Sequence, residues 1–153
     1  MTDKSHTHNP PDPFRASTFS AEGFMGVDSR SVQQIIEADL TAVRSLGHTP
    51  ESVAGLLTVA FDRAEGAFGD RVELCPGVFA VHYEARGKIQ SPFEDGGLFQ
   101  KGEVIVTERA GGAALNITRL GIHLVRKHGF FQGVGCRYRL DPAETVRLLG
   151  SLK

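Results

Sequence analysis

Six basic side chains in the last third of the chain could together bind an anionic ligand or partner. They are Arg119, His123, Arg126, Lys127, Arg137 and Arg139. At about 100° per residue, the first four project within one arc of a predicted helix. Such an arc could hold a phosphate, a carboxylate or a nucleic-acid backbone. The alternative interpretation is the solvated face of an amphipathic helix, which has the same composition.

The polar side of a predicted sheet offers a second set of candidates. His82 or Glu84 could act as a general base once the environment adjusts its pKa, with Arg86 or Arg109 holding the substrate. The side chains expected on this face are His82, Glu84, Arg86, Thr107, Arg109, Asn116 and Thr118. An antiparallel sheet with one face in water has a similar composition, so a purely solvated face is the alternative.

The segment Lys88 to Lys101 is longer than a typical hairpin connection, and long loops on a rigid scaffold often carry function. Glu94 and Asp95 could bind a divalent cation or act as a base, although adjacent side chains need not point at one atom. Phe93 and Phe99 could instead fold the segment back onto the core. We expect a lid or an interface element here in preference to a catalytic loop.

The histidines and cysteines lack the spacing of a known metal site. A metal centre would have to combine members of a scattered set: Cys75, His82, Glu84, His123, His128 and Cys136. His123 and His128 are five residues apart, which on a helix places them on different faces. The chain has no phosphate-binding glycine-rich motif, nucleophile elbow or dinucleotide fingerprint. The sequence therefore predicts neither a metal ion nor a cofactor.

Two helices are predicted before the segments that carry most of these residues. Apolar residues with a period of 3.6 indicate helices at about 31–46 and 50–68. Asp28 or Ser29 could cap the first helix, and Thr49 followed by Pro50 is typical of a helix start. Because the link between the helices is short, we expect an αα-hairpin.

After Gly69 the apolar period changes to two, which indicates strands. In residues 79–85 we expect Phe79 and every second residue after it to be buried. In residues 102–109 we expect Val104 and Val106 to be buried. A turn centred on Gly111 and Gly112 would place Val106 opposite Ile117 and Thr107 opposite Asn116.

The remaining segments complete the predicted fold. Residues 119–128 are expected to form a helix closed by Gly129, residues 137–140 a short strand, and the chain from Asp141 a last helix. The fold class is therefore α+β, with an N-terminal αα-hairpin followed by an antiparallel sheet of about four strands and further helices packed on one face.

One domain accounts for most of the chain. Residues 1–18 are rich in proline and polar residues and are expected to form a flexible N-terminal arm, and residues 19–153 a single α+β domain. No apolar run is long enough to cross a bilayer, and the first residues lack the apolar part of a signal peptide. We therefore expect a cytoplasmic protein without a membrane partner.

The net charge of −1 hides an asymmetry that shapes the functional hypotheses. Residues 113–153 contain 7 Lys and Arg against 2 Asp and Glu, so the C-terminal quarter is basic. Our leading hypothesis is a small binding or regulatory domain that recognises a small anionic ligand or partner through this segment. The alternatives are a small enzyme with a pocket between the polar sheet face and the 88–101 loop, and a nucleic-acid-binding protein. A homo-oligomer, formed through the arm or a strand edge, is a further expectation.

Overall fold

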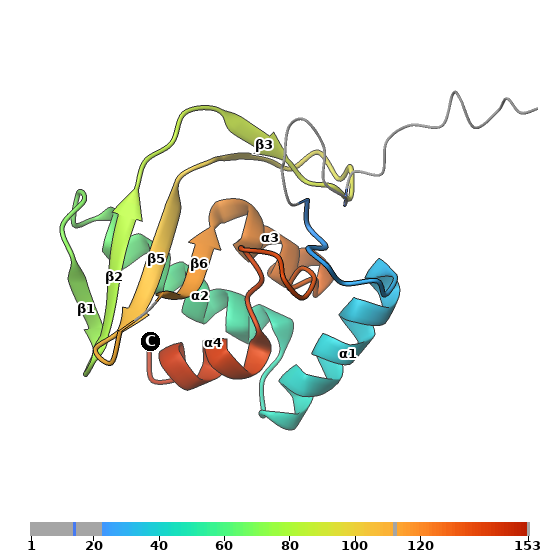
Figure 1. Cartoon of the computed structure of the whole chain (residues 1–153), viewed down its shortest axis with the longest axis horizontal. Coiled ribbons are helices and arrows are strands. Elements are labelled where there is room, and N and C mark those ends of the chain that lie inside the picture. Colours follow the sequence, from blue (N-terminus) through green and yellow to red (C-terminus); the bar gives the residue numbers. More distant parts are fainter. Residues whose placement is uncertain (1–13, 15–22, 112, 153) are drawn as a thin grey trace, which may run out of the picture.

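The fold is described from a computed structural model, which covers residues 14, 23–111 and 113–152 (Figure 1). The predicted arm, residues 1–18, lies outside this range except for Phe14. The described chain is α+β, as predicted, with a four-stranded sheet and a separate two-stranded ribbon. In chain order the elements are α1 (Val32–Ser45), α2 (Pro50–Glu65), β1 (Val72–Cys75), β2 (Val78–Tyr83), β3 (Lys88–Gln90), β4 (Leu98–Gln100), β5 (Glu103–Glu108), β6 (Ala113–Thr118), α3 (Arg119–His128) and α4 (Pro142–Leu149).

The helices begin at residues whose side chains satisfy free backbone N–H groups. Thr49 caps α2 by accepting a hydrogen bond from the Ser52 N–H, with Pro50 at the first helical position, as predicted. For α1 the predicted cap is wrong, because Ser31 and not Asp28 or Ser29 accepts from the N–H of Gln34. The second helix also ends earlier than expected, and Phe68 beyond it is 92% exposed.

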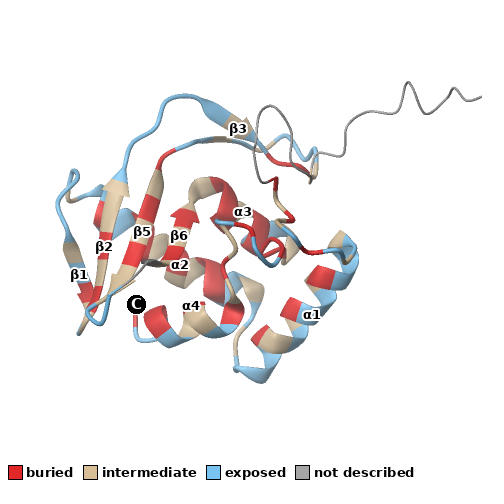
Figure 2. Cartoon of the chain, viewed as in Figure 1, coloured by how far each residue is buried: buried red, intermediate tan, exposed pale blue. Residues whose placement is uncertain are grey.

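The main sheet is antiparallel with strand order β1-β2-β5-β6, and its buried face packs against α2 (Figure 1). Val104 and Val106 on β5 are fully buried, as predicted. Residues paired directly across antiparallel strands share a face, so Ala80, which pairs with Val106, is buried too. Figure 2 shows buried residues alternating with less buried ones along β5.

On β2 the predicted alternation is inverted, because Val78 and Ala80 point toward the helices in place of Phe79 and Val81. Both sides of this strand are apolar, so the sequence of β2 alone could not decide between them. Pairing with β5 decides which side of β2 is buried, because the residues of β5 that face the helices are unambiguous.

The β5–β6 hairpin keeps the predicted faces but has a different register. Val106 lies opposite Leu115, and Val104 lies opposite Ile117, so the predicted pairing of Val106 with Ile117 is wrong by two residues. The cause is a longer turn, since Thr107 pairs with Ala113 after an irregularity in the strands. Because the shift is by two residues, Val104, Val106 and Ile117 all remain on the expected buried face.

Two segments differ from their predicted structure. Residues 137–138 form a turn and residues 139–140 have no regular structure, in place of the expected strand. The long 88–101 segment is largely ordered as the β3–β4 ribbon, with Ile89 opposite Phe99 and a tip at residues 91–97. Phe93 and Phe99 pack on a second apolar cluster around Leu124 and Phe130, as expected for a segment folded back on the core.

Asp28 ties the chain before α1 to the loop that follows α3. Its carboxylate accepts bonds from the Arg30 side chain at 2.6 and 2.9 Å and from the Val134 N–H at 3.1 Å. The Asp28 side chain is only 4% exposed. These hydrogen bonds, chiefly those from Arg30 and then that from the Val134 N–H, hold the pKa of the Asp28 carboxyl group well below its usual range.

We predict that Asp28→Asn lowers the free energy of unfolding at pH 7 by about 1.5–3 kcal/mol, the range for hydrogen bonds to charged groups. Because the folded-state pKa is depressed, this stabilisation is complete above the ordinary carboxyl pKa of about 3.9 and is lost as the pH falls toward the folded-state value. Urea unfolding at pH 7 and pH 3 measures both effects. The matched control is Asp70→Asn, at an exposed position. Equal losses in the two variants, or an unchanged acid dependence in Asp28→Asn, would contradict the prediction.

Candidate functional site

The predicted basic residues do not gather into one patch, because acidic side chains from earlier in the chain pair with them. Arg119 Nη2 lies 2.7 Å from Asp62 and 2.9 Å from Glu65. Its guanidinium also covers the Phe61 ring at 4.1 Å. These contacts join the start of α3 to the end of α2, which gives Arg119 a structural role.

The other predicted cations are also distributed over the molecule. Arg139 forms a largely buried pair with Asp39 at 2.8 Å, and Arg137 Nη2 lies 2.8 Å from Glu103 Oε1. Arg126 donates to the Thr58 hydroxyl, whereas Lys127 is exposed on α3. The charge asymmetry along the sequence is thus largely neutralised in space.

His82 does not share a solvated face with Thr107 and Asn116, so the predicted polar face is wrong. It pairs with Val104 and therefore lies on the helix side of the sheet, with its side chain 9% exposed. Its ring meets Phe61 edge-on at 5.4 Å, and its Nε2 lies 3.8 Å from Glu65. Arg109 lies at the opposite end of the β2–β5 pair, beside Glu73.

Four predicted site residues nevertheless line one cavity, which we call the helix-side cavity. It has a volume of about 820 Å³ and lies between α2, the start of α3 and the segment that joins β2 to β3. The four are His82, Glu84, Arg86 and Arg119. The structure thus brings the two predicted bases together with two of the predicted arginines, although not on an open sheet face.

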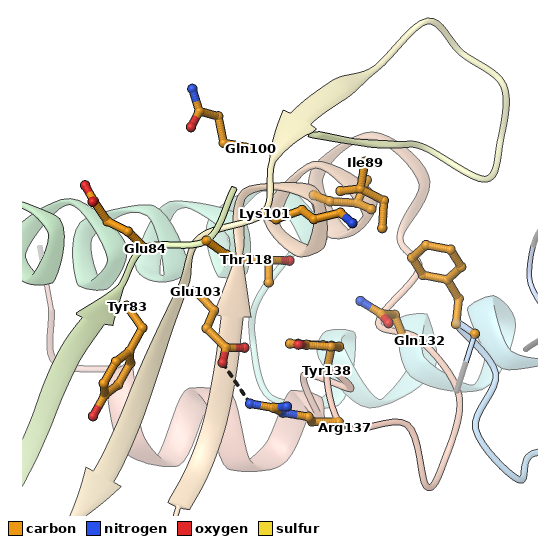
Figure 3. A pocket seen from close by; sticks show the side chains of 14 residues that line it. Tyr83, Glu84, Ile89, Gln100, Lys101, Glu103, Thr118, Gln132, Arg137 and Tyr138 are labelled. Atoms are coloured by element: carbon orange, nitrogen blue, oxygen red, sulfur yellow. Dashed lines mark hydrogen bonds and ion pairs between the residues drawn. The ribbon is translucent and has the colours of Figure 1, made fainter. Parts of the chain in front are cut away.

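A second cavity, which we call the ribbon cavity, lies between the outer sheet face and the β3–β4 ribbon (Figure 3). Its volume is about 390 Å³, within the usual range for small-molecule sites. Ile89 and Lys101 contribute the ribbon side, Glu103 and Thr118 the sheet side, and Arg137 the wall opposite the ribbon. Figure 3 shows Lys101 extended between the ribbon and Thr118.

Gln132 lines the ribbon cavity in a backbone conformation that few residues other than glycine adopt. Its φ is +73° and its side chain is buried. Arg139 donates to the Gln132 carbonyl at 2.6 Å and is itself held by Asp39. The next residue, Gly133, donates to the Phe24 carbonyl and leaves no room for a Cβ atom, which would meet Met25 at 2.1 Å. Strain maintained in this way is a frequent feature of binding sites.

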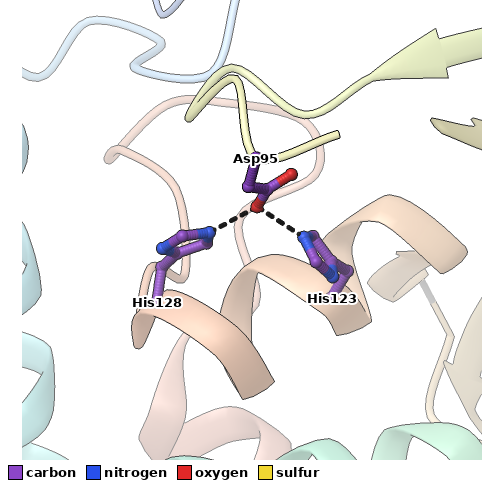
Figure 4. Close-up of side chains that lie close together, drawn as sticks. All are labelled: Asp95, His123 and His128. Atoms are coloured by element: carbon purple, nitrogen blue, oxygen red, sulfur yellow. Dashed lines mark hydrogen bonds and ion pairs between the residues drawn. The ribbon is translucent and has the colours of Figure 1, made fainter. Parts of the chain in front are cut away.

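The ribbon tip forms a third arrangement, in which one carboxylate meets two imidazoles (Figure 4). Asp95 Oδ2 lies 2.8 Å from His123 Nε2 and 2.6 Å from His128 Nε2. The expectation that these histidines diverge is therefore wrong. His128 is the last residue of α3, which lies beneath the ribbon tip. We call these three residues the Asp95 cluster.

The Asp95 carboxylate is positioned by its own loop as well as by the helix. Its Oδ1 accepts from the Gly97 N–H at 2.8 Å, and its Oδ2 lies 3.2 Å from the Ser91 hydroxyl. Hydrogen bonds from His128, then His123, then the Gly97 N–H hold the pKa of Asp95 well below its usual range. The carboxylate is thus kept ionised, the form needed to bind a cation.

Sequence reasoning considered Asp95 and both histidines but did not combine them, and it missed Lys101, Glu103 and Gln132. For Asp95 the sequence did contain a local signal. Ser91 and Gly97 lie in the same loop and are residues typical of turns, and both donate hydrogen bonds to the Asp95 carboxylate. For the ribbon cavity there was no local signal, because residues far apart in the sequence form its walls.

Comparison of the chain with models of known protein families, with curated proteins and with solved structures finds no match. Within the described residues, none of the helices has both the length and the apolar character needed to span a membrane.

Proposed function

We propose that this chain is a small-molecule binding domain whose ligand, a small organic anion, occupies the ribbon cavity. The observation that carries the proposal is a cation without an acidic partner in the wall of a cavity of suitable size. Among the described residues, no carboxylate forms an ion pair with Lys101. An anionic group of the ligand would take that place.

The polar groups around Lys101 support the same ligand class. Arg137 adds further N–H donors and is held in place by Glu103 on the sheet, which balances its charge. Thr118 Oγ1 accepts from the Gly121 N–H at the start of α3, so the hydroxyl proton can be donated to a ligand. Of the basic side chains in residues 113–153, only Arg137 lines this cavity.

Apolar groups line the other part of the ribbon cavity and favour a ligand with a hydrocarbon part. Phe24, Ile89 and Leu120 contribute this surface. A cavity with apolar walls and a few fixed polar groups is the usual form of a small-molecule site. We therefore propose a carboxylate or phosphate ester with an apolar portion in preference to an inorganic ion.

Lys101→Gln should weaken binding of such a ligand by about tenfold or more, since a charge-assisted hydrogen bond contributes about 1.5–3 kcal/mol. The measurement is thermal unfolding at low ionic strength with a panel of carboxylates and phosphate monoesters. A ligand at about 100 times its Kd stabilises the fold by about 2.7 kcal/mol. For a chain of this size that corresponds to roughly 5–10 °C in Tm.

The matched control for this experiment is Lys127→Gln, which removes an exposed lysine of α3 that does not line the cavity. Its ligand-induced shift in Tm should equal that of the unmodified chain. A panel in which no compound raises the Tm, or equal losses in the two lysine variants, would contradict the proposed function.

A further inference from the structure

The Asp95 cluster contains the donor atoms of a metal site in a convergent arrangement. Two imidazole nitrogens and one carboxylate oxygen lie within 4.8 Å of one another. Figure 4 shows both rings turned toward the same oxygen, with His123 and His128 on α3 and Asp95 above them on the ribbon tip. Two histidines and one carboxylate are an established ligand set for Zn²⁺ and for other divalent transition metals.

The distances are close to those of a metal-bound set. Ligands about 2.1 Å from a tetrahedral ion lie about 3.4 Å from one another. The two nitrogens lie 2.8 and 2.6 Å from Asp95 Oδ2, so an ion requires the groups to separate by roughly 0.7 Å. A small displacement of the ribbon tip, or a rotation of the Asp95 side chain, supplies this.

The groups around the cluster fix the ligands as a metal site requires. Phe93 stacks on the His128 ring at 3.8 Å with an interplanar angle of 9°, and Phe99 lies against the His123 ring at 4.7 Å. The Gly97 N–H and the Ser91 hydroxyl donate to Asp95 and orient its carboxylate. Carboxylates that bind metal ions are oriented by hydrogen bonds from surrounding groups in the same way.

Gly97 gives a further indication that space at the cluster is restricted. A Cβ atom at this position would lie 2.7 Å from Phe99, 2.9 Å from Asp95 Oδ1 and 3.2 Å from His123 Nε2. The first two distances are shorter than Cβ atoms adopt, so the Phe99 ring and the Asp95 carboxylate would have to shift. Glycine therefore lets the backbone approach both the carboxylate and one imidazole.

The cluster is also accessible from solvent. The side chains of Asp95, His123 and His128 are 15%, 21% and 20% exposed. An ion held by three protein ligands in such a position keeps a further coordination site for water, as catalytic zinc ions do.

We propose that Asp95, His123 and His128 bind one divalent transition-metal ion, Zn²⁺ in preference to others, with water in the remaining position. The three ligands tie the ribbon tip to α3, so the ion closes the loop onto the helix. The metal site does not require the ligand proposed for the ribbon cavity, because none of the three residues lines that cavity.

Titration calorimetry with Zn²⁺ tests the proposal on the full chain. The test uses a His6→Gln/His8→Gln background, so that histidines outside the cluster do not add to the measured binding. We expect one ion per chain, and at least about a 100-fold loss of affinity in His123→Gln, His128→Gln or Asp95→Asn. The matched control is His48→Gln, whose ring Nδ1 lies 3.0 Å from the nearby Ser52 hydroxyl, outside the cluster. Far-ultraviolet circular dichroism checks that each variant is folded.

Stoichiometric binding that the three substitutions leave unchanged would overturn the proposal, as would the absence of binding by the chain itself or an equal loss of affinity in His48→Gln. Loss of metal binding without loss of the anion-dependent Tm shift would leave the ribbon-cavity function intact. Stoichiometric Zn²⁺ binding by the unmodified chain without any anion-dependent Tm shift would contradict that function while leaving the metal site in place.

The Asp95→Cys variant distinguishes two interpretations of the cluster, a metal site and a hydrogen-bonded contact that only holds the loop. A thiolate is a good zinc and cobalt ligand but a poor acceptor for two imidazole N–H groups. We expect this variant to retain Co²⁺ binding and to gain a near-ultraviolet thiolate-to-cobalt absorption band. The unmodified chain with Co²⁺ is the spectroscopic control. A variant that binds no Co²⁺, or that binds it without the new band, would count against Asp95 as a ligand.

Discussion

The contact between one carboxylate and two imidazoles at the ribbon tip determines where the β3–β4 ribbon lies. The ribbon forms its own two-stranded sheet, separate from the main sheet, so backbone pairing to the main sheet does not place it. Asp95 holds its tip on α3, together with the apolar contacts of Phe93 and Phe99. The residues at the base of the ribbon, Gln100 among them, line both cavities. The geometry of the proposed ligand site therefore depends on the Asp95 cluster, although the two sites share no residue.

Ion pairs between distant parts of the chain explain why the basic C-terminal quarter does not form a basic surface. Asp39, Asp62 and Glu103 each approach an arginine that is at least 34 residues further along the chain. Exposed pairs contribute little to stability, but the buried pair of Arg139 with Asp39 fixes the backbone around Gln132. The asymmetry of charge thus reflects how early and late segments pack together. This is why the site proposed here relies on Lys101 and uses only one basic residue of that quarter, Arg137.

The sequence predicted the elements well and their contacts less well. The cap of α2 and the inward residues of β5 depend on neighbours in the chain, and these predictions were confirmed. The orientation of His82 depends on pairing with β5, because both sides of β2 are apolar, and that prediction was wrong. His123 and His128 were predicted to diverge because the helical spacing ignores side-chain rotation and the approach of a third residue. Their convergence on Asp95 depends on how the 91–97 tip folds, which no local pattern encodes.

The most direct measurement of the central claim is a crystal structure of the chain grown with one equivalent of Zn²⁺, with anomalous differences recorded at the zinc edge. The account predicts one anomalous peak about 2.0–2.2 Å from His123 Nε2, His128 Nε2 and Asp95 Oδ2, with a water on the solvent side. A peak at other residues only, beside an Asp95 carboxylate that still accepts hydrogen bonds from both imidazoles, would contradict it.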